Sequence, residues 1–149
     1  FGQAVIREDG TLDRQQLGEK VFGDEAARKR LEQIMHPAIR ALMLERMQAA
    51  ESKDPHILVV VDVPLLYESD IAHHFQEVML VYAPRSLQLK RLMERNGLTQ
   101  EQALHRIEAQ MDIEQKKKRA DIVIDNSGSI RETEAQVDNF WRSKNVKKR

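Results

Sequence analysis

Three short runs of apolar residues along the chain predict β-strands. Residues 57–61 read ILVVV, residues 78–82 read VMLVY, and residues 122–124 read IVI. Continuously apolar strands that are rich in β-branched residues are typical of a sheet buried on both faces. The segments between these runs carry apolar residues at helical spacing, and alternation of strands with helices indicates a parallel sheet. The pattern therefore predicts an α/β fold with three parallel strands.

The first fifty residues predict helices rather than strands. Thr11 can cap a helix that Gly23 closes, and Asp24 can cap the next helix. We expect His36 and Pro37 to break that second helix, because proline suits the first turn of a new helix and disrupts a helix interior. This segment would then consist of helical hairpins.

Stop and capping signals also predict the helices of the second half. A helix after residues 78–82 should end at Gly97. Capping boxes of the form [ST]-x-x-[EQ] begin at Thr99 and at Ser129. The predicted helices are one that ends at Gly97, one from Thr99 to about Met111, one from Asp112 that includes Lys116 to Arg119, and a last one that turns Val137, Phe140 and Trp141 inward.

Composition narrows the class of protein. The 149 residues are 41% hydrophobic, which is enough to bury a core, and Lys+Arg equals Asp+Glu at 24 each. This balance argues against a dedicated nucleic-acid binder, which usually has a basic excess. The absence of cysteine excludes a disulfide scaffold and a cysteine-ligated zinc site, and it fits a reducing cytoplasm. No apolar stretch approaches the ~20 residues that cross a bilayer.

A carboxylate follows the first apolar run directly. Asp62 would lie at the carboxyl end of a strand, where ligands bind in open α/β sheets. This arrangement has the form of a Walker B element, which holds Mg²⁺ in P-loop NTPases. The alternative is an aspartate that caps the next turn. After Pro64, Leu65 and Leu66 leave the sheet together, and they would line an apolar groove for a ligand or pack within a subdomain.

Basic and amide side chains follow the second and third runs. Arg91 and Arg95 share a helix face at i and i+4, and arginine can neutralise charge on a transferring phosphoryl group. The alternative is a solvated face paired with Glu94, and a solvated face is also the preferred interpretation of residues 116–119. Asn126 could read an adenine edge or form a tight turn. The pair His73–His74 lacks the spacing of a metal site.

Several of these stretches together resemble one family, dephospho-coenzyme A kinase. The matching stretches are FGQAVIREDGTLDRQQLGEKVF, LEQIMHPAIR, VVVDVPLLYES, VYAPRSLQLKRLMERNGLTQEQALHRIEAQM and ADIVIDNSGS. They occur in the order of the family and span nearly the whole chain. The family phosphorylates the ribose 3′-hydroxyl of dephospho-CoA with ATP, which is the last step of CoA biosynthesis.

The resemblance implies a P-loop-kinase-like parallel sheet with a helical CoA-binding subdomain and a lid. Residues 1–56 would form the subdomain, residues 57–84 the core strands, residues 85–119 the lid region, and residues 120–149 the last strand and helix. The partners would be ATP with Mg²⁺ and dephospho-CoA, without nucleic acid or membrane, in the cytoplasm.

The resemblance also implies roles for individual residues. Arg91 would contact the transferring phosphate, with Arg95 and Asn126 on the ATP side. Asp62 would lie near the Mg²⁺, through water, and close to the phosphates. The acceptor side would comprise His36, Leu65, Leu66 and Arg106.

The printed residues depart from the family pattern in one respect. They contain no G-x-x-x-x-G-K-[ST] loop, which cradles the phosphates, and no Asp-Ala-Asp motif, which holds the candidate general base. The sheet would be incomplete, and we expect the 149 residues alone to be inactive. Two other functions stay open: a non-catalytic binder of CoA-like ligands, and another nucleotide kinase of the same fold. A basic helical nucleic-acid binder rests only on the KKKR run and the basic tail.

Overall fold

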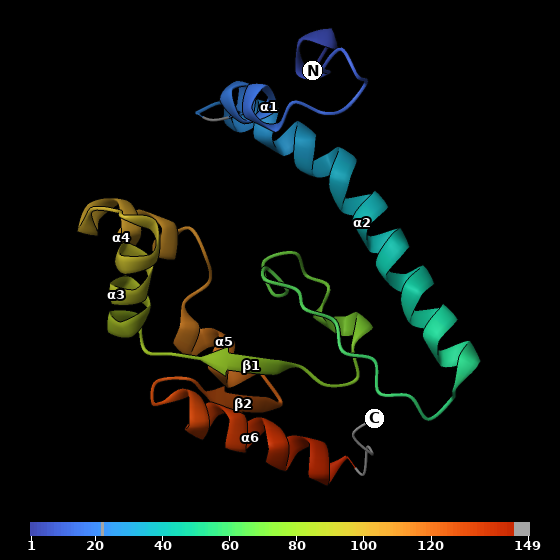
Figure 1. Ribbon diagram of the computed structural model, residues 1–149, viewed down its shortest axis with the longest axis vertical. Coiled ribbons are helices and arrows are strands. Elements are labelled where there is room, and N and C mark those ends of the chain that lie inside the picture. Colours follow the sequence, from blue (N-terminus) through green and yellow to red (C-terminus); the bar gives the residue numbers. More distant parts are fainter. Residues whose placement is uncertain (22, 145–149) are drawn as a thin grey trace. The chain divides into compact units, whose positions relative to one another are not determined.

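The computed structural model describes residues 1–21 and 23–144, and it divides into two compact units, Phe1–Val60 and Val61–Arg149 (Figure 1). Among the described residues, no helix combines the length and apolar character that a membrane span requires.

The first unit contains a short 3-10 helix, Gln3–Val5, followed by helices α1 (Arg14–Val21) and α2 (Glu25–Lys53). Helix α1 begins at Arg14 and not at Thr11, so this boundary prediction was wrong. The Thr11 hydroxyl donates to Asp9 Oδ1 at 2.6 Å, which engages it within its own turn. The Asp13 carboxylate accepts the free N–H groups of Gln15 and Gln16 instead, both at 3.0 Å.

Helix α2 runs through Pro37, so the predicted break at His36–Pro37 was wrong. Its start was predicted correctly, because Asp24 accepts a hydrogen bond from the Ala27 N–H at 3.0 Å. Proline removes one hydrogen bond from a helix interior and crowds the preceding turn, at a cost of about 3 kcal/mol. A break would expose several backbone groups on each side, and the flanking residues are good helix formers.

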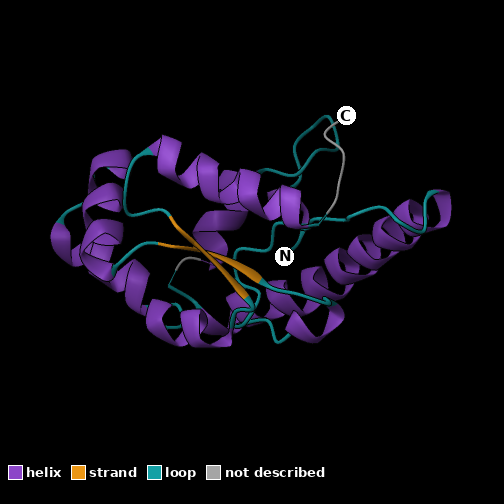
Figure 2. Ribbon diagram, turned by 90° about the horizontal axis from the view of Figure 1, so that it is seen from below, coloured by secondary structure: helices purple, strands orange, loops and turns teal. Residues whose placement is uncertain are grey.

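The second unit contains strands β1 (Met79–Tyr82) and β2 (Ile122–Asp125), which pair in parallel with Met79 opposite Ile122 and Tyr82 opposite Asp125. Figure 2 shows the two strands crossing at an angle, as sheet twist requires. Helices α3 (Arg85–Asn96), α4 (Gln100–Glu108) and α5 (Ile113–Arg119) lie between the strands in sequence, and α6 (Ile130–Ser143) follows them. A 3-10 turn, Ala72–His74, precedes β1. The parallel α/β arrangement was predicted correctly.

Residues 57–61 do not form a strand, which corrects the prediction for the ILVVV run. The sheet of the described residues consists of β1 and β2 alone, and residues 57–61 pair with neither. A strand needs its backbone N–H and C=O groups paired, and apolar side chains do not supply that pairing. Ile57 and Val60 are accordingly 44% and 69% exposed.

The caps of the second unit follow the sequence closely. Both capping boxes form, at Thr99–Gln102 and Ser129–Glu132, and Gly97 ends α3 in the left-handed conformation with φ 62°. Helix α4 stops at Glu108, short of the predicted Met111. The Met111 N–H donates to the Glu68 side chain at 2.9 Å instead of continuing the helical ladder.

Burial in the second unit is concentrated in a few side chains. Tyr67, Ile71, Ala103 and Ile124 are buried, and Val137, Phe140 and Trp141 of α6 are half-buried as predicted. Lys116 is also buried, at 8% exposure, although residues 116–119 were expected to form a solvated face. Its partner, Glu68, comes from a distant part of the chain, so the sequence pattern around Lys116 does not reveal its burial.

Candidate functional site

The carboxyl ends of β1 and β2 meet at one edge of the sheet. Tyr82 lies opposite Asp125, and the Asn126 N–H donates to the Tyr82 carbonyl oxygen at 2.7 Å. Ligands of open α/β sheets bind at this edge. Asn126 therefore lies at the ligand-binding edge of the sheet, and its contact with adenine stays a prediction.

The Asn126 side chain is oriented by helix α6. The Thr133 hydroxyl lies 3.2 Å from Asn126 Oδ1 and 3.3 Å from the Ser129 carbonyl oxygen, to either of which it can donate. The amide nitrogen of Asn126 has no hydrogen-bond partner among the described residues. The amide nitrogen is therefore free to donate to a ligand, and Oδ1, which has two lone pairs, can still accept.

The neighbouring Asp125 is held by two sets of hydrogen bonds. Hydrogen bonding from Ser127, whose N–H lies 2.8 Å from Asp125 Oδ1, lowers the pKa of the Asp125 carboxyl. The Gln136 side chain pairs with the Asp125 peptide group, accepting from its N–H and donating to its carbonyl oxygen, both at 2.8 Å. Gln136 thus occupies backbone groups at the end of β2 as a neighbouring strand would. The role of Gln136 was not predicted, because no local sequence pattern distinguishes it from other helix glutamines.

Helix α5 attaches to the same edge through Tyr82. The Tyr82 hydroxyl donates to Glu114 Oε1 at 2.7 Å, and Lys117 Nζ lies 4.0 Å from the centre of the Tyr82 ring. The hydrogen bond to Glu114 raises the pKa of the Tyr82 phenol. Glu114 and Lys117 are three residues apart on a helix, so they lie on the same side of α5 and flank the ring. These contacts set the position of α5, and they were not predicted.

The predicted arginines lie on the helical hairpin of α3 and α4. An ion pair between Arg85 and Glu108 links the two helices. Arg91 and Arg106 are exposed and make no ion pair with the described residues, and Arg95 Nε donates to its neighbour Asn96 at 3.0 Å. The expected alternative partner, Glu94, lies 4.0 Å from Lys90 instead. The three guanidinium groups are therefore not committed to carboxylates of this unit.

The segment after Asp62 forms a compact turn, residues 64–71, which we call the PLLYE turn. Backbone N–H groups of Ser69, Asp70 and Ile71 donate to carbonyl oxygens of residues 65, 67 and 66, and Asp70 adopts a left-handed φ of 52°. Within this turn Leu65 is 45% exposed and Leu66 is half-buried. Asp62 is exposed, and no strand positions it.

Two side chains of the PLLYE turn reach α5 and the residues before it. Glu68 Oε1 accepts from Lys116 Nζ at 2.7 Å and from the Met111 N–H at 2.9 Å. Burial raises the pKa of the Glu68 carboxyl, but the hydrogen bonds from Lys116 and Met111 outweigh it, so the pKa falls below its usual value. The Arg119 guanidinium lies 4.5 Å from the centre of the Tyr67 ring.

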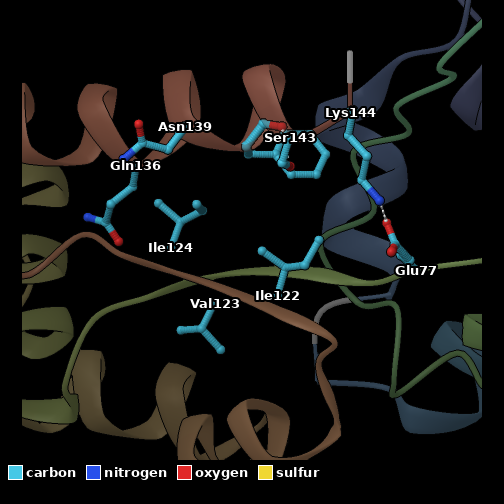
Figure 3. A pocket seen from close by; sticks show the side chains of 9 residues that line it. Glu77, Ile122, Val123, Ile124, Gln136, Asn139, Ser143 and Lys144 are labelled. Atoms are coloured by element: carbon cyan, nitrogen blue, oxygen red, sulfur yellow. Dashed lines mark hydrogen bonds and ion pairs between the residues drawn. The ribbon is translucent and has the colours of Figure 1, made fainter. Parts of the chain in front are cut away.

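A groove of about 460 Å³ lies between β2 and α6 (Figure 3). Ile122 and Ile124 point toward the helix, whereas Val123 points away from it (Figure 3). The polar groups at the rim of the groove are largely engaged in hydrogen bonds and ion pairs. Lys144 pairs with Glu77, and Gln136 pairs with the backbone of Asp125. The groove therefore offers few free polar groups to a substrate, and it includes none of the predicted site residues.

The predicted residues are not joined to one another directly. Among those in the described part of the second unit, no side-chain hydrogen bond or ion pair links any two. His36 lies on the exposed surface of α2, in the first unit. The described residues contain no group of three or more metal-ligating side chains, so Asp62 is a single carboxylate. One carboxylate with water fits Mg²⁺, which commonly keeps several waters and takes the rest of its ligands from substrate phosphates.

Known proteins share both the sequence and the fold of this chain. A protein-family model described as Dephospho-CoA kinase matches residues 1–132. The chain is 48% identical to the dephospho-CoA kinase of Bacillus licheniformis over 137 residues, which cover 92% of this chain and 68% of that protein. It is 46% identical to the Symbiobacterium thermophilum enzyme over 143 residues, with 96% and 59% covered.

Solved structures give the same result. The dephospho-CoA kinase of Campylobacter jejuni matches with a TM-score of 0.72 and 35% identity, covering 93% of this chain and 68% of that one. TT1252 from Thermus thermophilus matches with a TM-score of 0.69 and 33% identity, covering 95% and 71%. The fold and the sheet edge thus define an α/β kinase of the P-loop type. Within that class, the chain belongs to the dephospho-CoA kinase family.

Proposed function

We propose that the protein transfers the γ-phosphoryl group of ATP to the ribose 3′-hydroxyl of dephospho-CoA, which yields CoA and ADP. The observation that carries this proposal is the family match over residues 1–132, supported by relatives of the same name at 48% and 46% identity. The reaction is the last step of CoA biosynthesis. Its substrates are two small molecules, ATP as donor and dephospho-CoA as acceptor.

Arg91 is the residue to which we assign stabilisation of the transferring phosphoryl group. Phosphoryl transfer is catalysed mainly by positioning and by cations that meet the developing negative charge. Arg91 is exposed and free of carboxylate partners among the described residues, so its guanidinium is available to a phosphate. Arg95, one turn further along α3, assists on the ATP side.

Asn126 contacts the adenine of ATP in this proposal. Its position at the carboxyl edge of the sheet supports the assignment, and the free amide nitrogen can donate to a ring nitrogen of adenine. Hydrogen bonding by Thr133 fixes the rotamer of the side chain, which reduces the entropy lost on binding.

The acceptor side uses His36, Leu65, Leu66 and Arg106. The exposed face of Leu65 suits an apolar part of dephospho-CoA, and Arg106 suits its anionic groups. Mg²⁺ would accompany ATP and neutralise phosphate charge, with Asp62 as a contact through water. We place the protein in the cytoplasm, a reducing compartment with which a cysteine-free chain is compatible.

A coupled assay of ADP release tests the proposal. The protein expressed from its full-length gene is mixed with ATP and Mg²⁺, since the 149 residues contain no phosphate-cradling loop and are expected to be inactive alone. Either dephospho-CoA or a panel of adenosine, AMP, CMP and pantetheine is added as acceptor. We expect ADP release with dephospho-CoA and none above background with the panel. The CoA product is verified by its mass, which exceeds that of dephospho-CoA by one phosphoryl group.

Two results would contradict the proposal in different ways. Turnover of another nucleotide in preference to dephospho-CoA would assign the protein to a different kinase activity. Tight binding of dephospho-CoA in a calorimeter without any ADP release would support the non-catalytic alternative.

A further inference from the structure

Lys116 is a buried charged side chain whose role the assignments above leave open. It is 8% exposed, and its Nζ lies 2.7 Å from Glu68 Oε1. Glu68 is itself mostly covered, with 22% of its side chain exposed. Taking both charges out of water costs several kcal/mol for each ion, so such a pair is seldom retained for stability alone.

The geometry of the Glu68 carboxylate suggests what the pair does. One oxygen, Oε1, accepts from two donors at separate places, Lys116 within α5 and the Met111 N–H just before it. Two directional bonds to one atom fix both the distance and the orientation of the PLLYE turn relative to α5. An apolar contact of the same area would allow the turn to slide.

The next residue in the turn supplies a second attachment. Tyr67 is 7% exposed, and Arg119 of α5 lies over its ring at 4.5 Å. Arg119 also approaches the Met111 sulfur at 3.7 Å. The PLLYE turn is thus held to α5 by two consecutive side chains, while Leu65 and Leu66 sit on the same turn and keep exposed surface.

We propose that Glu68 and Lys116 are positioning residues for the acceptor substrate: their ion pair fixes the PLLYE turn on α5 and thereby places Leu65 and Leu66. The inference rests on the proposed function, since it assumes that these leucines border dephospho-CoA. Neither charged group touches the substrate, so the pair acts through the turn. Its loss should weaken acceptor binding while leaving ATP binding nearly intact.

Three variants separate positioning from simple stability: Glu68→Gln, Lys116→Met, and the double variant. Lys116→Met leaves a partly exposed carboxylate without its cation and should lower Tm by about 5 °C. The double variant removes both charges and should recover most of that loss. We expect KM for dephospho-CoA to rise about tenfold in Lys116→Met and in the double variant, because the turn loses its bond to Lys116 even when stability returns. The rise should be smaller in Glu68→Gln, because the glutamine oxygen can still accept from Lys116 and from the Met111 N–H. KM for ATP should change less than about twofold.

The exposed pair of Glu25 and Lys29 provides a matched control. Its Nζ–Oε1 distance is also 2.7 Å, but both side chains are about two-thirds exposed, at 67% and 65%. Glu25→Gln, Lys29→Met and their double variant should leave Tm and both KM values nearly unchanged, because exposed pairs contribute little.

The outcomes are distinguishable. If the wild-type enzyme is active and KM for dephospho-CoA is unchanged in the three variants, the inference is overturned while the proposed function stands. Recovery of KM together with Tm in the double variant would also overturn it, since the pair would then be only structural. A wild-type protein without dephospho-CoA-dependent ADP release would overturn the proposed function, and the inference with it.

Discussion

Arg91 is the residue on which the proposed chemistry depends most directly. It lies on α3 with its side chain exposed, and no carboxylate of the described residues neutralises it. A guanidinium in this state keeps its donors available for the planar, bidentate recognition of a phosphate.

Replacing Arg91 should therefore lower kcat rather than stability. We expect Arg91→Ala to reduce kcat by about 10³-fold with an unchanged Tm, and Arg91→Lys to recover part of the loss, because lysine keeps the charge but not the fork of donors. Steady-state ADP release measures both. Arg142→Ala on α6 serves as the control, and an equal loss there would show that Arg91 has no special role.

Glu68 gives a second prediction at this scale, in its dependence on pH. Its pKa in the folded protein lies below the usual value of 4.5, because hydrogen bonds from Lys116 and Met111 outweigh the effect of burial. The ionised carboxylate then stabilises the fold above pH 4.5, and that contribution is lost as pH falls from 4.5 through the lowered pKa. The difference in Tm between wild type and Glu68→Gln should shrink over this range. A difference that grows on acidification would contradict the assignment.

Helix α2 shows that one proline does not decide the limits of an element. Pro37 lies inside a helix of 29 residues, where it lacks an N–H and crowds the preceding turn. The hydrogen bonds of the many other residues of the helix exceed this local cost.

Pro37→Ala should consequently stabilise the protein, by up to about 3 kcal/mol in the free energy of unfolding. The adjacent Ala38→Gly should do the opposite and cost about 1 kcal/mol. Urea denaturation followed by circular dichroism measures both. A destabilised Pro37→Ala variant would mean that the proline conformation is needed where it stands.

The Gln136 side chain joins helix α6 to strand β2 through hydrogen bonds to the backbone N–H and carbonyl oxygen of Asp125. Gln136→Met should remove both hydrogen bonds to the Asp125 peptide and cost about 2 kcal/mol in the free energy of unfolding. Asn139→Met is the matched control on the same helix and the same groove, and it should cost much less. Similar losses in the two variants would show that the Gln136 bonds contribute nothing particular.

At the scale of the whole molecule, the predicted acceptor residues belong to different units. His36 lies in unit Phe1–Val60, and Leu65 and Leu66 lie in unit Val61–Arg149. The chain between helix α2 and the second unit has no regular structure, and Pro55, His56 and Ile57 are exposed there. An exposed connection without regular structure should be the part of the chain that a protease cleaves first.

Limited proteolysis tests that expectation. Trypsin should cleave after Lys53 before it cleaves inside helix α2, because the connection lacks the helical hydrogen bonds that protect the interior of the helix. Equal rates of cleavage after Lys53 and after Arg40 inside the helix would show that the connection is no more accessible than the helix.

The division between what was predictable and what was not follows the range of the interactions. The capping boxes at Thr99 and Ser129, the Asp24 cap and the Gly97 stop were predicted correctly, since each depends on residues within one helical turn. Strands β1 and β2 and their parallel pairing were also predictable, because apolar runs that alternate with helices leave few other arrangements. The position of Asn126 at the sheet edge was predictable for the same reason. The roles of the site residues stay predictions.

The tertiary structure decided the features that require a partner from elsewhere in the chain. Residues 57–61 have the composition of a strand but find no backbone to pair with among the described residues. Lys116 is buried because Glu68 meets it across a long separation in sequence, and α4 ends early because the same carboxylate takes the Met111 N–H. A sequence determines its own local hydrogen bonds and apolar pattern, whereas distant pairing depends on which groups the completed fold brings within about 3 Å of each other.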